Sequence, residues 1–330
     1  MEKFIDFKIH TQKEKKFTIL QLTDMQVIDS SQQRYVGRLP EDQIIRWKPE
    51  KVEENCYSHI IEAVERVSPD LIIITGDIVY GQFDDSGRIL RDFLRFMGEL
   101  NIPWAPVFGN HDNESKLGVD TQCQLYAAAK NCLFSRGNLT GNSNYTIGIY
   151  EDNELKRILY MMDTNGCLYK SGFAEDQIEW LKNTSQKVSE ITGTKIPGFL
   201  FCHIPTADYC TAIVDAGYQT EEELGLPIEF SIGEDRIPAS PGDCGKKKQE
   251  LFPEKCAQAM EAILISSDID GVFAGHFHRM HFSIQHGSIR YTLGVKCGTY
   301  DRYTPDQLGG TKILLESGRK DYSVEYVYHM

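Results

Sequence analysis

The sequence predicts an α/β (α+β) fold in which two β-sheets share one domain. Between residues 16 and 108, apolar runs alternate with segments of helical spacing, which is the pattern of right-handed crossovers in a parallel sheet. After residue 280, short segments of alternating polar and apolar residues predict antiparallel strands that build a second sheet. The early strands all end in polar clusters that carry an aspartate or an Asn-His pair. The prediction of function depends on these strand ends.

The strand predicted at the centre of the first sheet is Leu71–Ile74. Turn residues bound this apolar run, as in a strand that is buried on both faces. Gly76 permits a sharp turn that delivers Asp77 to the edge of the sheet, where ligands bind in open α/β folds. An ionised aspartate beside a hydrophobic strand needs a positive partner, so we expect a metal ion at Asp77.

The remaining elements are predicted from the helical or alternating spacing of their apolar residues. The predicted helices are 50–67, 88–100, 119–131, 174–190 and 253–267. The predicted strands are 16–22, 103–108, 144–150, 156–162, 197–202, 269–274, 280–285, 288–293, 311–315 and 322–328. Acidic residues, Gly and Pro dominate from about 205 to 253. We therefore predict a single domain over 1–330, with an insertion at about 205–253 that folds over the site or, alternatively, forms a peripheral excursion.

Composition excludes some classes of partner. A formal net charge of −13 argues against binding of a nucleic-acid duplex, but a small phosphate-bearing substrate stays open because metal ions invert the local charge. No apolar run is long enough to span a bilayer, so we expect no membrane partner. The charged N-terminus lacks the apolar core of a signal peptide, and the nine cysteines form no CxxC pair. We expect a cytoplasmic protein; its oligomeric state is not predicted.

Polar residues at successive strand ends are the candidates for chemistry. A lone histidine there is more often structural than a ligand, and Asn110 alone would pass for a turn residue. The recurrence of such residues at five strand ends favours one shared site instead. Mixed Asp, His and Asn donors suit Zn, Mn, Fe or Ni, and their number favours two ions that share a carboxylate. The candidates are Asp24, Asp77, Asn110, His111, His203, His276 and His278.

As a set, these residues resemble the signature of the calcineurin-like metallophosphoesterase superfamily. Asp24, Gly76-Asp77, Gly109-Asn110-His111-Asp112, His203 and Gly275-His276-x-His278 match that signature in order. The resemblance covers about residues 17–295 and implies two mixed β-sheets that form a sandwich flanked by helices, with a binuclear metal site at the strand ends. It implies that Asp77 bridges the ions, that Asp24 and His278 complete the first shell, and that Asn110, His203 and His276 complete the second.

The resemblance also implies an activity. A hydroxide that bridges the two ions would attack a small phosphate mono- or diester in line, which makes the protein a phosphoesterase. His111 would protonate the leaving group or steady the phosphoryl oxygens, and Asp112 would orient its ring. The competing hypothesis is a scaffold or interaction protein that kept the fold and lost catalysis.

Two positions bear on the identity of the metals. Gln26 stands where the usual first motif, Asp-x-His, has histidine, so it is either a weak neutral ligand or no ligand. Tyr80 stands where purple acid phosphatases have Gly-Asp-x-x-Tyr with the tyrosine on ferric iron, and those enzymes also lack the first-motif histidine. Tyr80 is thus predicted either to bind Fe(III) or simply to pack beside the strand. The two ions are expected to be Fe, Mn or Zn, and the resemblance extends to the purple-acid-phosphatase-like branch.

Overall fold

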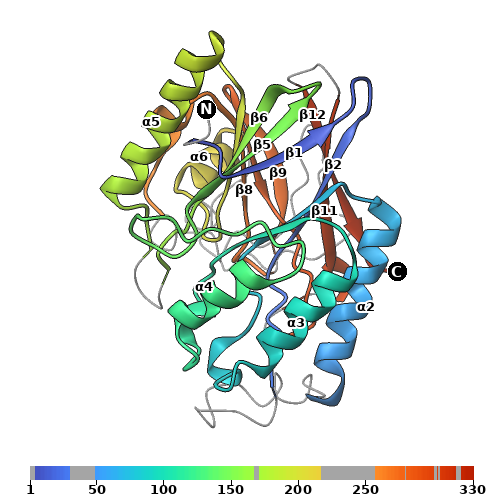
Figure 1. The fold of residues 1–330 in the computed structure, drawn as a ribbon. Coiled ribbons are helices and arrows are strands. Elements are labelled where there is room, and N and C mark those ends of the chain that lie inside the picture. The colour runs from blue at the N-terminus through green and yellow to red at the C-terminus, as the bar shows by residue number, and fades with distance from the viewer. Residues whose placement is uncertain are drawn as a thin grey trace.

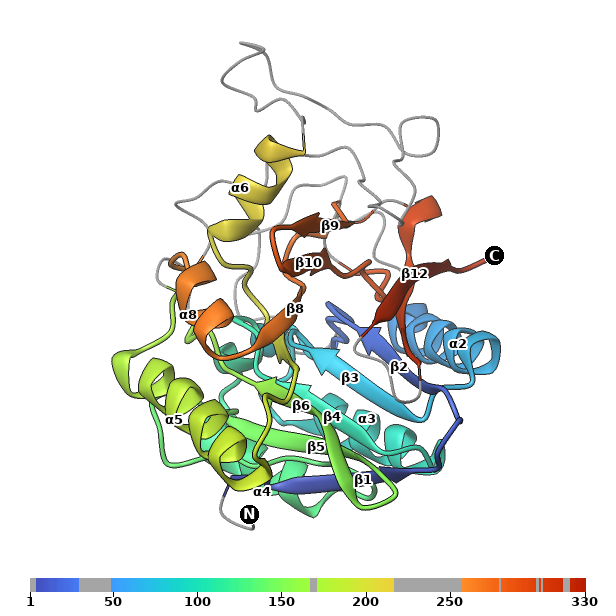
Figure 2. The ribbon, with the colours of Figure 1, turned by 90° about the horizontal axis from the view of Figure 1, so that it is seen from above.

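Two β-sheets pack face to face and helices cover both outer faces, which gives the molecule four layers (Figures 1 and 2). This computed structural model describes residues 4–29, 49–166, 171–216, 257–278, 280–300, 303, 305–316 and 321–330. Within these ranges, no helix combines the length and the apolar composition needed to cross a lipid bilayer. The predicted fold class, two mixed sheets flanked by helices, is confirmed.

The five-stranded sheet carries the predicted crossovers. Its order is β12-β11-β2-β3-β4, and β2, β3 and β4 run parallel. Helices α2 and α3 connect these three strands and lie on the outer face. The elements are β2 (Phe17–Leu22), α2 (Pro49–Val67), β3 (Leu71–Thr75), α3 (Arg88–Glu99), β4 (Trp104–Val107), α4 (Val119–Ala128), β11 (Gly309–Leu315) and β12 (Tyr322–Tyr328). The central strand β3 is buried at every position, as its continuous apolar run predicted.

The seven-stranded sheet has the order β1-β5-β6-β7-β8-β10-β9 and mixes parallel with antiparallel pairs. Its outer face is covered by α5, α6 and α8. The elements are β1 (Phe7–Thr11), β5 (Tyr145–Glu151), β6 (Glu154–Met161), α5 (Glu175–Thr192), β7 (Gly198–Phe201), α6 (Asp208–Asp215), α8 (Glu261–Ser266), β8 (Ile269–Ala274), β9 (Phe282–His286) and β10 (Ile289–Leu293).

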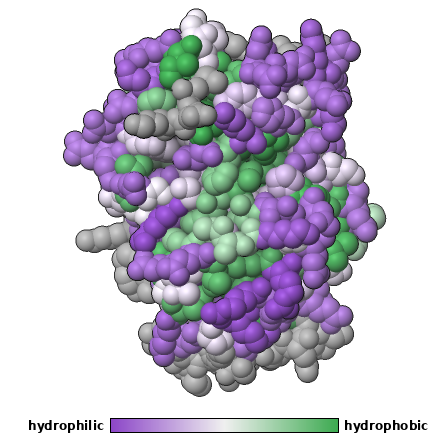
Figure 3. All heavy atoms as spheres, viewed as in Figure 1, coloured by the Kyte–Doolittle hydropathy of each residue, from purple (hydrophilic) through white to green (hydrophobic). Residues whose placement is uncertain are grey.

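The core lies on both sides of the seven-stranded sheet because successive side chains of a strand point to opposite faces. Phe199 and Phe201 of β7 pack between the two sheets, whereas Leu200 packs against the outer helices. On the outside, polar side chains cover most of the face seen in Figure 3, and an apolar band crosses its middle. Burial on both faces fixes the register of the strands, and thereby the positions of their ends.

Three predictions about elements are wrong in detail. The C-terminal segments do not form a sheet of their own: β10 pairs with β8 and extends the larger sheet, and β11 pairs with β2 and extends the smaller one. Strand β1 was not predicted, because its alternating residues at the sheet edge are mostly charged or half-exposed. The last helix begins at Glu261 rather than at 253, since Ala257 instead forms a bridge with Thr206. Of the predicted insertion, residues 217–253 lie outside the described ranges, and α6 occupies its first part.

Candidate metal centre

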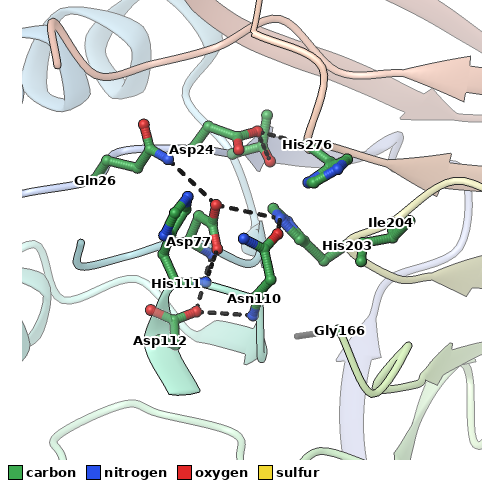
Figure 4. Close-up of polar contacts among 12 residues, drawn as sticks. Asp24, Gln26, Asp77, Asn110, His111, Asp112, Gly166, His203, Ile204 and His276 are labelled. Atoms are coloured by element: carbon green, nitrogen blue, oxygen red, sulfur yellow. Dashed lines mark hydrogen bonds and ion pairs between the residues drawn. The ribbon is translucent and has the colours of Figure 1, made fainter. Parts of the chain in front are cut away.

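The candidate ligands follow strands of both sheets and meet at one end of the sandwich (Figure 4). The loops after β2, β3 and β4 carry Asp24, Asp77 and Asn110-His111. The loops after β7 and β8 carry His203 and His276, with His278 two residues further on. Ligand atoms of Asp24, Asp77 and His203 all lie within 4.8 Å of one another, and all three residues are buried. Segments far apart in sequence therefore converge, as the strand-end argument predicted.

The loops reach this geometry through strained backbone. The φ angles of Asp24, Asp77 and His276 are 54°, 53° and 77°, in the left-handed region that residues other than glycine rarely adopt. Backbone hydrogen bonds hold these turns: Asp24 N–H donates to the Gly76 carbonyl at 3.2 Å, and Gln26 N–H donates to the Asp77 carbonyl at 2.8 Å. Strain of this kind persists only where the surroundings enforce it, and it gathers at functional sites.

Glycines make room for the carboxylates. A Cβ at Gly109 would lie 2.2 Å from Asp77 Oδ1 and 2.3 Å from the Asp77 nitrogen. A Cβ at Gly275 would lie 1.9 Å from Thr23 Oγ1 and 2.8 Å from Asp24 Oδ2. The glycines beside the predicted ligands are thus required by close approach of the chain.

Replacement of Gly109 by alanine should destabilise the protein by about 2 kcal/mol, because the methyl group overlaps the buried Asp77 carboxylate and the loop must move. The measurement is denaturant unfolding of the metal-free protein. Gly98→Ala is the matched control: Gly98 lies in α3, its added Cβ would lie 3.1 Å from Lys130 Cβ and 3.7 Å from the Lys130 carbonyl oxygen, and alanine favours a helix. Equal stability of the Gly109 variant and the wild type would contradict the close approach.

His203 has the arrangement of a metal-binding imidazole. Its Nδ1–H donates to the Thr75 carbonyl at 2.7 Å, which fixes the tautomer and the orientation of the ring. Its Nε2 then lies 3.3 Å from Asp77 Oδ2 and 3.1 Å from Asn110 Oδ1. The His276 ring meets the His203 ring edge to face, with centroids 5.2 Å apart. Oxygen and nitrogen donors of the predicted second ion thus converge on this side of Asp77.

On the other side of Asp77, Asp24 offers an oxygen to a cation. Its Oδ2 accepts hydrogen bonds from the His276 backbone N–H at 2.9 Å and from Thr23 Oγ1 at 2.7 Å. Its Oδ1 is buried and accepts no well-formed hydrogen bond, although His278 Nε2 lies 3.2 Å away. A buried carboxylate oxygen without a hydrogen bond is costly unless an ion meets it. The donors and this unsatisfied oxygen fit a metal ion.

The charges in the site are mutually dependent. Burial by itself raises the pKa of Asp77, but the charges of His203 and His111 and the His203 hydrogen bond outweigh it and lower that pKa. For Asp24, burial is likewise outweighed, here chiefly by the neighbouring His278, and the pKa is lowered. Burial lowers the pKa of His203, yet the Asp77 carboxylate raises it to about 10. Burial and the neighbouring His203 lower the pKa of His276 to about 3. Metals bind ionised carboxylates and neutral imidazoles, so an ion bound at His203 would displace the proton that its raised pKa retains.

Asp112 does not orient the His111 ring, so that prediction is wrong. Its Oδ2 accepts the backbone N–H groups of Asp77 at 2.9 Å and Gly109 at 2.8 Å, and its Oδ1 accepts that of Val79 at 3.1 Å. Burial and the charge of Asp77 raise the pKa of Asp112 to about 7. Asp112 therefore ties the loops after β3 and β4 together.

Glu114 contacts the His111 ring instead. Its Oε2 lies 2.9 Å from His111 Nδ1, and a 3₁₀ turn (Asp112–Glu114) brings the two side chains to the same side. Sequence reasoning missed this residue, although a carboxylate three positions after His111 was a readable signal. The backbone N–H of His111 donates to Asp77 Oδ1 at 2.9 Å, which couples its position to the metal ligands.

Tyr80 packs against neighbouring rings, which agrees with the packing role that was one of the two predicted for it. Its ring stacks on His111 with centroids 3.9 Å apart and meets Phe83 and Tyr300 edge to face. The hydroxyl's coordination of Fe(III) stays a prediction.

Gln26 lies beside Asp77, and its amide nitrogen points toward the carboxylate (Figure 4). Its Nε2 lies 3.3 Å from Asp77 Oδ2, and its Oε1 accepts a hydrogen bond from Lys296 Nζ at 2.7 Å. Sequence reasoning missed Lys296 as well, since no local pattern connects position 296 with a turn 270 residues earlier.

The two-sheet fold with a cluster of candidate metal ligands at its strand ends is also found in a known family. A model of the calcineurin-like phosphoesterase family matches residues 17–280, and the chain belongs to that family.

Relatives and solved structures are more distant. Phosphatase DCR2 of Saccharomyces cerevisiae is 25% identical over 221 residues, which are 59% of this chain and 36% of that protein. Probable inactive purple acid phosphatase 14 of Arabidopsis thaliana is 26% identical over 186 residues, 47% of this chain and 46% of that protein. The matches thus span less than half the length of these curated relatives. A dimetal phosphatase from Danio rerio shares the fold with a TM-score of 0.55 at 12% identity, covering 94% of this chain and 95% of that one.

Proposed function

We propose that the protein is a metal-dependent phosphoesterase that hydrolyses small phosphate mono- or diesters. The observation that carries the proposal is the buried convergence of Asp24, Asp77 and His203 within 4.8 Å, at a point where strands of both sheets end. Family membership supports the same reaction class.

The residues fit a pair of divalent or trivalent ions of Fe, Mn or Zn. Asp77 would be shared, Asp24 and His278 would hold one ion, and Asn110, His203 and His276 would hold the other. Such ions would orient a phosphate ester and lower the pKa of the attacking water. The protein itself fixes the orientation of the donor groups before substrate binds. The Thr75 carbonyl orients the His203 ring, and the close approach of the Gly109 loop orients the Asp77 carboxylate.

His111 would act on the substrate itself. Its side chain is largely buried yet 12% exposed and contacts Glu114 through Nδ1, and in this proposal its Nε2 would face a phosphoryl or leaving-group oxygen. In the protonated state the ring would donate a proton to the departing alkoxide. The stacked Tyr80 ring restricts its rotation.

The proposal is tested by hydrolysis of p-nitrophenyl phosphate and bis(p-nitrophenyl) phosphate after reconstitution with Mn(II), Zn(II) or iron. We expect turnover that depends on the added metal and disappears with a chelator. Folded protein that binds metal and hydrolyses neither ester under any of these conditions would support the competing proposal, a scaffold that lost catalysis. That alternative is supported by three relatives that are named as probable inactive purple acid phosphatases of Arabidopsis thaliana.

We also propose a reducing compartment such as the cytoplasm. The six cysteines within the described ranges are free thiols, and four of them are buried.

Glu114→Gln should lower kcat about tenfold while metal content stays the same, because the amide keeps the shape but no longer stabilises a protonated His111. The alkaline limb of the pH–rate profile should move to lower pH, since the imidazolium loses its anionic partner. If Glu114 were merely structural, the substitution would change the stability of the protein and leave the pH–rate profile unchanged. Glu154→Gln, at an exposed residue paired with Lys156, is the matched control.

A further inference from the structure

Lys296 is a buried cation at the edge of the candidate metal centre. Only 2% of the residue is exposed, and it lies in the segment that connects β10 with β11. Its ammonium donates to the Asp24 carbonyl at 2.8 Å and to Gln26 Oε1 at 2.7 Å. A lysine is rarely buried to this extent unless its charge has a defined partner.

The lysine fixes which end of the Gln26 amide faces Asp77. An amide coordinates a metal through its oxygen, and here the oxygen is held by the ammonium group. The nitrogen is left to face Asp77 Oδ2 at 3.3 Å. Residue 26 thus stabilises the carboxylate as a hydrogen-bond donor, and its oxygen reaches an ion only if the contact with Lys296 breaks.

Lys296 also brings positive charge to one side of the site. Burial raises the pKa of Asp24, and the charge of Lys296 helps to lower it, after the larger effects of His278 and His203. A cation between Asp24 and His278 would meet this fixed ammonium nearby, with little water to screen it. On the other side of Asp77 the donors are Asn110 Oδ1 and the imidazoles of His203 and His276.

We propose that Lys296 makes the two ion positions unequal: it withholds the Gln26 oxygen and repels a cation, so the position at Asp24 and His278 binds its ion more weakly and exchanges it more readily. The inference deepens the proposed function and depends on it. The protein would then hold one resident ion and acquire the second according to the metal supply.

The test is titration of the metal-free protein with Mn(II), followed by calorimetry and by electron paramagnetic resonance. We expect two steps, with a signal of isolated Mn(II) after one equivalent and a spin-coupled signal after the second. His278→Asn should remove the second step and leave the first. In Lys296→Met, the affinity of the second step should rise about tenfold or more, because the ammonium charge is removed and the Gln26 amide can rotate its oxygen toward the ion.

Two further variants keep the outcomes distinct. Lys312→Met removes a lysine that pairs with Glu325 on β11 and β12, and it should leave both steps unchanged. If Lys296→Met does not fold, Gln26→Met is measured instead. Because residue 26 is not a ligand in this proposal, the affinity of the second step should change less than about twofold. Equal affinities in the wild type, an unchanged or weaker second step in Lys296→Met, or a large loss in Gln26→Met would each overturn the inference and leave the proposed function standing. No bound Mn(II), Zn(II) or iron at all would overturn both.

Discussion

Asp77→Asn should reduce metal affinity by about a hundredfold or more and bring phosphoesterase activity down to background. Asp77 Oδ1 accepts the His111 N–H at 2.9 Å, and the amide oxygen of asparagine can keep that bond. The amide nitrogen would then replace Oδ2 and turn its hydrogens toward His203 Nε2 and Gln26 Nε2, each 3.3 Å away in the wild type. The shared anionic ligand is lost while the shape of the side chain is kept.

The measurement is elemental analysis of the dialysed protein together with hydrolysis of p-nitrophenyl phosphate. Asp70→Asn is the matched control, because Asp70 directly precedes β3 and lies at the opposite end of the same strand, bonded to the Thr18 N–H and to Lys15. We expect full metal content and activity in that control. Wild-type metal content in Asp77→Asn would remove Asp77 from the ligand set.

His111→Asn should lower kcat by about 10²- to 10⁴-fold while both ions stay bound. The side chain contacts Glu114 and stacks on Tyr80, so its removal takes away a proton donor without taking away a predicted ligand. Its backbone N–H, which donates to Asp77, is unchanged by the substitution. The loss should therefore appear in kcat and not in metal content, the reverse of what a ligand shows.

Steady-state kinetics at saturating metal concentration measures kcat, and elemental analysis measures the metal content. His10→Asn, on the exposed β1 at the edge of the larger sheet, provides the same change far from the site and should be silent. Retention of wild-type kcat in His111→Asn would contradict a catalytic role and assign His111 to the support of its loop.

The strands that carry the site were predictable because their apolar runs are continuous. β3 and β7 are buried at every position, and such runs leave a signal that needs no knowledge of the partner strands. Edge strands leave a weaker signal: β1 went unpredicted, and the sheet membership of β9 to β12 was wrong. Pairing between distant strands is decided by the complementary faces of the whole sandwich, which no local window contains.

The residues of the candidate site were likewise predictable only in part. Aspartates, histidines and glycines that directly follow strands were found from order and spacing alone, since the end of a parallel strand predicts where its next side chains point. Asp112 was found, but the role that the resemblance implied for it, orienting the His111 ring, is wrong, because its oxygens accept three backbone N–H groups instead. Glu114 makes that contact across one turn of 3₁₀ helix.

By itself, then, the sequence determined the class of fold, the family resemblance and the identity of the residues at the strand ends, because strand periodicity and motif order are local properties of the chain. Only the tertiary structure decided which groups meet: that Asp24, Asp77 and His203 lie within 4.8 Å, and that Lys296 turns the Gln26 amide toward Asp77. The physical reason is that hydrogen bonds and charges act over a few ångströms in space, while the residues involved are up to 272 positions apart in the chain.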